Sequence, residues 1–270
     1  MHFLRVRILL YCMVCLLTCS ASLLAQEFRI ETDLYLGESS KPVGHNVTLF
    51  DNGMVYDFQV GVDAPDEIIE ISIFDRTKQQ FVLLDLKRKV RLELERSQLI
   101  QMLEGLRNEM MQQDETRYLA DVEFEEEHDL STDEVTLTTD SIRYKILGTQ
   151  PRDTMVLPVY HDFLDHYTML AASDPRRFPP FARLKCNSII KKYGWLPTRI
   201  EFLFSGGPKT NRQLEARTEH TNQFQLSKRD RDRIETARRN WTSFQRVSLR
   251  EYRQLAVAAA DRSDKTRKSR

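Results

Sequence analysis

The segment from Tyr160 to His166 holds the side chains best suited to bind a metal ion. On a helix, His161 would lie one turn from Asp165, and Asp162 one turn from His166. Each pair could supply two ligands, but the pairs lie on different faces and the spacing indicates no third ligand. An ordinary hydrogen bond between an imidazole and a carboxylate explains the same spacing. We therefore predict no metal and no cofactor, and we keep His161 and Asp165 as the candidate ligands to test.

Cys186 is the candidate for a catalytic nucleophile. It would need a basic partner such as His161 or His166 and an electropositive, accessible setting. Its place on the apolar face of an expected helix predicts a buried small side chain instead. The sequence contains no Gly-rich phosphate-binding loop, no His-Glu-x-x-His and no Gly-x-Ser-x-Gly motif. We therefore predict no catalytic residues, and a hydrolase remains the last alternative.

The first 25 residues have the pattern of a cleavable signal peptide. Arg5 and Arg7 precede an apolar run over residues 8–17, and small residues follow at positions 20–25. An uncleaved membrane anchor would need about 20 continuous apolar residues. Cys19 offers a second alternative, attachment of a lipid. We predict export to the periplasm or the exterior, with cleavage within residues 21–26.

Charge divides the remaining chain into an acidic body and a basic end. Residues 26–207 carry 21 basic and 32 acidic residues, a net of −11, whereas residues 208–270 carry 17 and 8, a net of +9. Trp241, Phe244 and Tyr252 among the arginines would suit a nucleic-acid surface, but export argues against that partner. We expect the basic end to contact an anionic envelope surface or to dock onto the acidic body.

Alternating apolar residues predict strands over much of the first half. Such patterns cover residues 28–36, 47–60, 69–86 and 135–146, and Asp51-Asn52-Gly53 predicts a hairpin turn. Helical spacing appears from Ser97 over about 15 residues, and again over residues 159–172 and 181–193. Because strands and helices come in separate runs, we predict an α+β fold. Its curved antiparallel sheet would have about eight strands, with three helices packed on one face.

The domain boundaries follow from composition. Cys186 is the only cysteine beyond the expected signal peptide, so a core and no intramolecular disulfide must stabilise the body. We predict a domain over 26–207, a polar linker over 208–226, a basic helical segment over 227–260 as a C-terminal appendage, and a disordered tail over 261–270. Ser248 and Glu251 have the spacing of a capping box within that segment.

The layout of residues 27–204 resembles the periplasmic lipoprotein-carrier (LolA-like) superfamily. The resemblance rests on the opening strand Phe28–Gly37, the hairpins around residues 51–53 and 75–80, and the strand Ile142–Ile146. It implies an open half-barrel of antiparallel strands with helices in its mouth and a cavity that holds acyl chains. It carries over no functional residues.

The predicted function is the binding of an apolar or amphiphilic ligand, such as a lipid, between sheet and helices. The candidate cavity residues are apolar side chains of the expected strands: Phe28, Ile30, Leu34, Phe58, Ile71 and Ile73. Their alternative role is to fill an ordinary core. A structural or interaction protein tethered by its basic C-terminal helices is the alternative function, and we predict no nucleic-acid partner.

Overall fold

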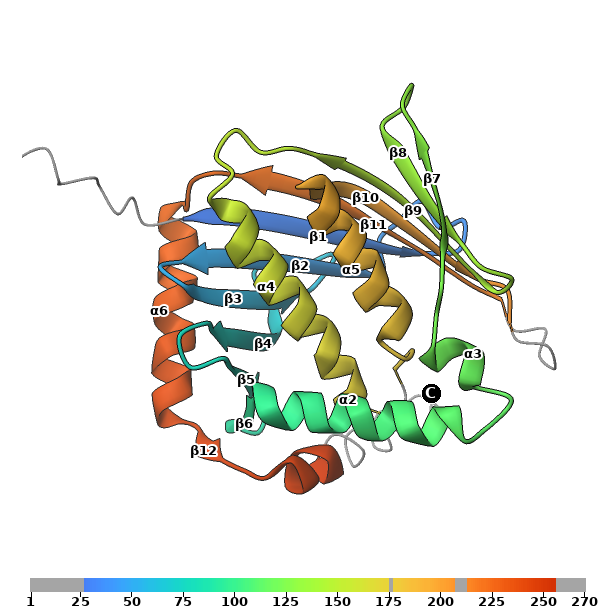
Figure 1. The fold of residues 1–270 in the computed structure, drawn as a ribbon. Coiled ribbons are helices and arrows are strands. Elements are labelled where there is room, and N and C mark those ends of the chain that lie inside the picture. The colour runs from blue at the N-terminus through green and yellow to red at the C-terminus, as the bar shows by residue number, and fades with distance from the viewer. Residues whose placement is uncertain (1–26, 175–176, 207–212, 256–270) are drawn as a thin grey trace, which may run out of the picture.

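The computed structural model describes residues 27–174, 177–206 and 213–255. They form one curved, mostly antiparallel sheet with several helices, which confirms the predicted α+β class (Figure 1). The predicted signal peptide over residues 1–25, with Cys19, and the tail over residues 261–270 lie outside the described residues. No helix in these described ranges combines the length and the apolar character needed to cross a bilayer.

Twelve strands of the described residues share this sheet, where the sequence predicted about eight. They are β1 (Phe28–Leu36), β2 (Gly44–Asp51), β3 (Met54–Val60), β4 (Ile68–Asp75), β5 (Gln80–Asp85), β6 (Val90–Glu95), β7 (Glu125–Asp129), β8 (Glu134–Thr138), β9 (Ile142–Thr149), β10 (Leu196–Phe204), β11 (Leu214–Gln223) and β12 (Gln245–Arg246). Their order across the sheet is β12-β6-β5-β4-β3-β2-β1-β11-β10-β9-β8-β7. Neighbours are antiparallel except β12, which pairs with β6 in parallel. The predicted turn between β2 and β3 has positive φ at both Asn52 and Gly53, as a tight hairpin requires.

The helices interrupt the strands at three places along the chain. They are α2 (Arg96–Met111), α3 (Arg117–Ala120), α4 (Val156–Met169), the short 3-10 helix η1 (Leu170–Ser173), α5 (Phe181–Tyr193) and α6 (Lys228–Ser243). The C-terminal helix covers residues 249–255. The predicted α5 matches in both bounds, because Pro179 and Pro180 interrupt the chain before it and Gly194, at φ 64°, ends it. The capping box of the C-terminal helix is also present, since Ser248 and Glu251 bond each other reciprocally.

One face of the sheet, here called the inner face, packs against α2, α4 and α5. Figure 1 shows α4 and α5 crossing this face side by side. An aromatic cluster forms the contact: Phe28 stacks on Phe50 with ring centroids 3.9 Å apart, and Phe163 of α4 lies edge-on to Phe50 at 5.8 Å. Burial of these large rings supplies much of the stabilisation of the layer.

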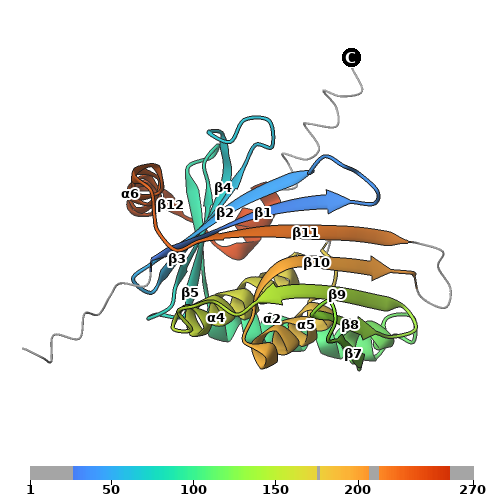
Figure 2. The same ribbon diagram turned by 90° about the horizontal axis from the view of Figure 1, so that it is seen from above.

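The opposite face, here called the outer face, is covered by α6 where β2–β6 lie. Figure 2 shows α6 on the other side of these strands from α4 and α5. Ile234, Ala237 and Phe244 pack there against the outward side chains of the strands. The sequence predicted this segment as a C-terminal appendage, whereas α6 packs on the sheet itself. The strands that α6 covers have both faces buried, as in Phe81–Leu84 of β5.

The predicted linker over residues 208–226 contains a central strand of the sheet. β11 pairs with β1 on one side and with β10 on the other. The prediction that the body ends at residue 207 is therefore wrong, because β11 is the strand that joins β1 to β10 within the sheet. The apolar alternation of β11 is weak, because beyond Leu214 its chamber-lining residues are small or polar: Ala216, Thr218 and His220.

Candidate ligand-binding cavity

A cavity of about 490 Å³ lies between the inner face of the sheet and the helices α4 and α5. We call it the main chamber. Its floor comes from β1, β2, β3, β9, β10 and β11, and its roof from α4, η1, the segment 177–180 and the start of α5. The lining is mainly apolar and aromatic: Ile30, Leu34, Phe50, Tyr144, Tyr160, Phe163, Leu164, Tyr167, Phe178, Ile200, Phe202 and Leu214. Cavities of this size and character are typical of small-molecule sites.

A second cavity of about 390 Å³, the side chamber, adjoins the main chamber. The two share Asp57, Tyr167 and Arg177 as lining residues. The side chamber is more polar, with Glu70 and Asp85 on its sheet side. Its far wall is the C-terminal helix, whose Leu249, Tyr252 and Arg253 line it. The Nε atom of Arg253 donates to the carbonyl oxygen of Ser173 across 2.7 Å, which ties the C-terminal helix to η1.

Asp57 is the buried carboxyl group where the two chambers meet. Its Oδ1 accepts from Thr48 Oγ1 at 2.7 Å, and its Oδ2 accepts from Asn46 Nδ2 at 2.8 Å. Burial raises its pKa, and the hydrogen bonds from Thr48, Asn46 and Tyr167 offset only part of that effect. Burial likewise raises the pKa of Glu70. Both groups therefore bind protons more readily than exposed carboxyls do.

His220 lies on the floor of the main chamber in its neutral form. Its Nδ1 lies 2.9 Å from Oγ1 of Thr32, and its Nε2 lies 3.0 Å from Oγ1 of Thr218. Burial, followed by the positive charge of Arg183, lowers its pKa to about 3. The imidazole is thus an uncharged hydrogen-bonding group at neutral pH, and it adds no positive charge to the cavity.

The six predicted cavity residues do not come together. Ile30 and Leu34 line the main chamber, whereas Phe28 belongs to the packed aromatic cluster of the inner face. Phe58, Ile71 and Ile73 lie on the outer face, buried beneath α6. Alternation of apolar residues does not reveal which face of a strand meets which helix, so the three outward residues were assigned to the wrong side.

The candidate metal ligands occupy structural positions. His161 Nε2 donates to the carbonyl oxygen of Trp195 across 3.3 Å, and burial lowers the pKa of this imidazole. Asp165 Oδ1 accepts from Asn187 Nδ2 at 3.1 Å. Within the described residues, no group of three or more His, Cys, Asp or Glu side chains is arranged to hold a metal ion.

The candidate nucleophile Cys186 is fully buried on α5. Burial raises the pKa of its thiol to about 11, with only partial compensation from Arg183. A thiol of this kind stays protonated at neutral pH, and the thiolate is the reactive form. Its geometry is that of a core side chain.

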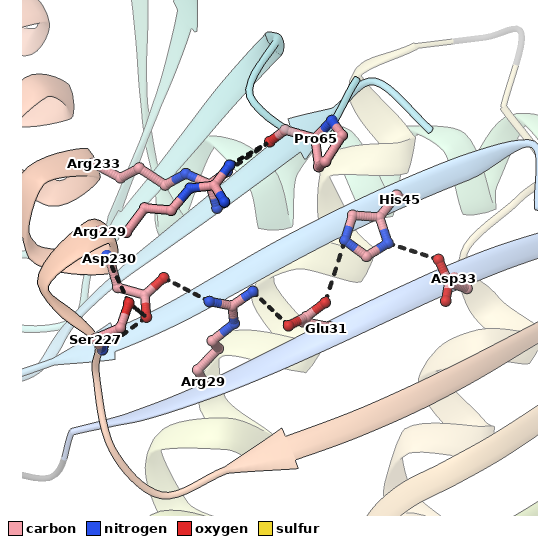
Figure 3. Close-up of polar contacts among 9 residues, drawn as sticks. All are labelled: Arg29, Glu31, Asp33, His45, Pro65, Ser227, Arg229, Asp230 and Arg233. Carbon is pink, nitrogen blue, oxygen red and sulfur yellow. Dashed lines mark hydrogen bonds and ion pairs between the residues drawn. The ribbon is translucent and has the colours of Figure 1, made fainter. Parts of the chain in front are cut away.

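The basic α6 is joined to the acidic body by a set of ion pairs and hydrogen bonds. Figure 3 shows Arg29 between Asp230 and Glu31. Glu31 in turn contacts His45, and His45 contacts Asp33. In the same view Arg229 and Arg233 point at the carbonyl oxygen of Pro65. Further along α6, Arg238 pairs with Asp51 at 2.8 Å, and near its start Arg231 pairs with Glu27.

Comparisons with known proteins find little that resembles this chain. No family model matches it, and no curated protein matches it. Among solved structures, that of PNGF-II is similar with a TM-score of 0.37 and 11% identity, and the match covers 85% of this chain. The chain spans 33% of the length of that protein. So distant a likeness carries no argument about function.

Proposed function

We propose that this protein binds an apolar or amphiphilic ligand in the main chamber after its export from the cytoplasm. The observation that carries the proposal is the cavity of about 490 Å³ between sheet and helices, lined mainly by apolar side chains. Protein interiors are normally packed to crystal density with few voids larger than a water molecule. An apolar space of this size therefore favours a ligand over a filled core.

The floor of the chamber supports the same proposal. β11 runs through the middle of the sheet, yet it presents Ala216, Thr218 and His220 to the interior where neighbouring strands present Phe and Ile. Small and polar inward residues leave space above the strand and supply hydrogen-bonding groups. An amphiphile could place its chain against the apolar walls and its polar end against these groups.

The resemblance to the lipoprotein-carrier superfamily supports acyl chains as the first ligand class to test. That resemblance implies a bent antiparallel sheet with helices across its mouth. The sheet is open and curved, and α4 and α5 cross its inner face. Our proposal does not extend to the transport of lipoproteins, because the resemblance carries over no functional residues.

The tether alternative has less support than ligand binding. It needs arginines of the basic end to be available to an envelope surface, but several α6 arginines pair with body carboxylates, including Arg231 with Glu27 and Arg238 with Asp51. The hydrolase alternative gains no support from its candidate nucleophile, because Cys186 is buried and burial raises the pKa of its thiol.

Binding of N-phenyl-1-naphthylamine, an uncharged apolar dye that fluoresces in apolar surroundings, tests the proposal. We expect saturable binding to the full chain and its loss in Ala216→Trp, which fills the chamber from β11. Glu215→Trp adds the same side chain at the adjacent exposed position, on the opposite face of that strand, and should bind like the unmodified protein. Absence of binding to the unmodified protein, or equal binding by both variants, would reject the chamber as the site.

A further inference from the structure

We propose that the ligand of the main chamber is an acid, whose carboxylate is bound by Arg183 at the α5 end of the chamber. This inference rests on the proposed function and names the class of ligand, a long-chain carboxylic acid. Arg183 lies in the first turn of α5 and lines the chamber. The helix itself does not explain a positive charge in its first turn, because basic residues are favoured at the C-terminal end of a helix.

The guanidinium of Arg183 is held in place from two helices. Its Nε donates to Asn187 Oδ1 across 3.0 Å. Asn187 is itself fixed from α4, since its Nδ2 lies within hydrogen-bond distance of the Leu164 carbonyl oxygen, Thr168 Oγ1 and Asp165 Oδ1. The Arg183–Asn187 bond uses Nε and leaves both Nη groups for another acceptor. An arginine oriented in this way is prepared for the two-point binding of a carboxylate.

Arg183 lacks a negative partner among the residues that the structure describes. No Asp or Glu in these ranges forms an ion pair with it, whereas Arg29, Arg76 and Arg238 each have one. Asp57 faces the same chamber, but Thr48 and Asn46 already occupy its oxygens. A half-buried cation without a counter-charge is unfavourable, and an anionic ligand would remove that cost.

Other polar groups of the chamber can complete an anion site. Tyr144, Tyr160 and His220 line the main chamber together with Arg183, and tyrosine hydroxyls can donate to a carboxylate. The start of α5 faces the same space, and the partial positive charge of a helix N-terminus adds to the attraction.

Apolar side chains line much of the rest of the chamber, among them Ile200, Phe202 and Leu214, which is 40% exposed. A ligand with its carboxylate on Arg183 would extend its chain along these residues toward the exposed rim. The competing ligand is an amphiphile with a cationic head group, which Asp57 would bind while the acyl chain lies along the same apolar residues.

The test compares three ligands of equal chain length: palmitate, hexadecanol and hexadecylamine. Each displaces N-phenyl-1-naphthylamine from the full chain at pH 8, below the concentration at which it aggregates. We expect palmitate to bind about tenfold or more tightly than hexadecanol, as for a charge-assisted hydrogen bond. Arg183→Met should bring the two affinities together, and Arg183→Lys should restore part of the difference. Lys185→Met removes a positive charge from an exposed position of the same helix and should change nothing.

The outcomes separate this inference from the proposed function. Equal affinities for palmitate and hexadecanol on the unmodified protein would overturn the acid site while leaving the apolar chamber intact. Preference for hexadecylamine would also overturn it and would assign the head group to Asp57. Absence of all binding would reject the chamber itself. Since acid and alcohol are compared within each variant, a general folding defect in Arg183→Met would weaken both and could not imitate the expected loss of preference.

Discussion

The Nη1 atom of Arg29 lies 2.8 Å from Oδ1 of Asp230, although 201 residues separate them in the chain. This pair joins β1 to the start of α6, and the side chain of Asp230 is only 1% exposed. Asp230 also accepts at Oδ2 from the backbone N and the Oγ of Ser227, which completes a capping box. One carboxylate therefore completes the capping box of α6 and joins the helix to the sheet.

Substitution Asp230→Ala should strongly destabilise the protein. It leaves Arg29 without its buried partner and removes the side-chain half of the capping box of α6, whereas the bond from the backbone N of residue 230 to Ser227 Oγ remains. Loss of one member of a buried pair costs about 3 kcal/mol or more. Asp232→Ala, an exposed position on the same helix, should change the free energy of unfolding by less than about 0.5 kcal/mol. Urea unfolding measures both. Similar values for the two variants would show that the pair contributes little.

The same carboxylate predicts a dependence of stability on pH. Burial acts to raise the pKa of Asp230, but the bonds from Ser227 and the charge of Arg29 outweigh it, and the net pKa is lowered. A lowered carboxyl pKa stabilises the fold above the pKa of an unfolded Asp, about 3.9, and this stabilisation is lost as pH falls through the folded value. Asp230→Asn should therefore flatten the acid side of the stability profile. An unchanged slope would contradict the assignment.

Undocking of α6 should expose an apolar sheet face and not simply release a tail. Ile234 packs on the outer face over β2–β5, so Ile234→Asp buries a charge and should cost about 3 kcal/mol or more. Arg239→Asp introduces the same residue at an exposed position of α6 and should be tolerated. Deletion of residues 227–270 should give an aggregating protein in gel filtration. A monomeric, stable deletion variant would show that α6 is dispensable.

The C-terminal helix should slow ligand release through the side chamber. Tyr252 lines that chamber, and burial raises its pKa. Tyr252→Ala removes part of the far wall and should speed dye dissociation about fivefold, the equivalent of about 1 kcal/mol. Arg250→Ala lies at an exposed position of the same helix and serves as the control. Stopped-flow release measures both rates, and equal rates would mean that ligands leave by another route.

Local patterns predicted most of the elements on the inner face. Helical spacing and the flanking Pro and Gly gave the bounds of α5, and Asn52-Gly53 gave the first hairpin. The run Phe81–Leu84 also carries information that a search for alternating apolar residues overlooks. Four consecutive apolar residues indicate a strand buried on both faces, and this predicts a cover on the outer face, which α6 provides.

β11 could not be recognised from hydropathy because of where it lies. A strand whose inner face borders an open chamber needs no large apolar side chains, so Leu214–Gln223 resembles a polar linker. The only signal was the alternation of Ala216, Thr218 and His220 with charged residues. Arg183 was missed for a similar reason, since its role depends on the absence of a counter-charge in three dimensions.

Ligand binding in the main chamber can be tested by native mass spectrometry of protein purified without detergent. We expect a bound acyl-chain acid on the unmodified protein and on Glu215→Trp, and its loss in Ala216→Trp. An unmodified protein that carries no ligand and takes up none from added palmitate would rule out the binding that we propose. So would an Ala216→Trp variant that is folded and still carries the same ligand.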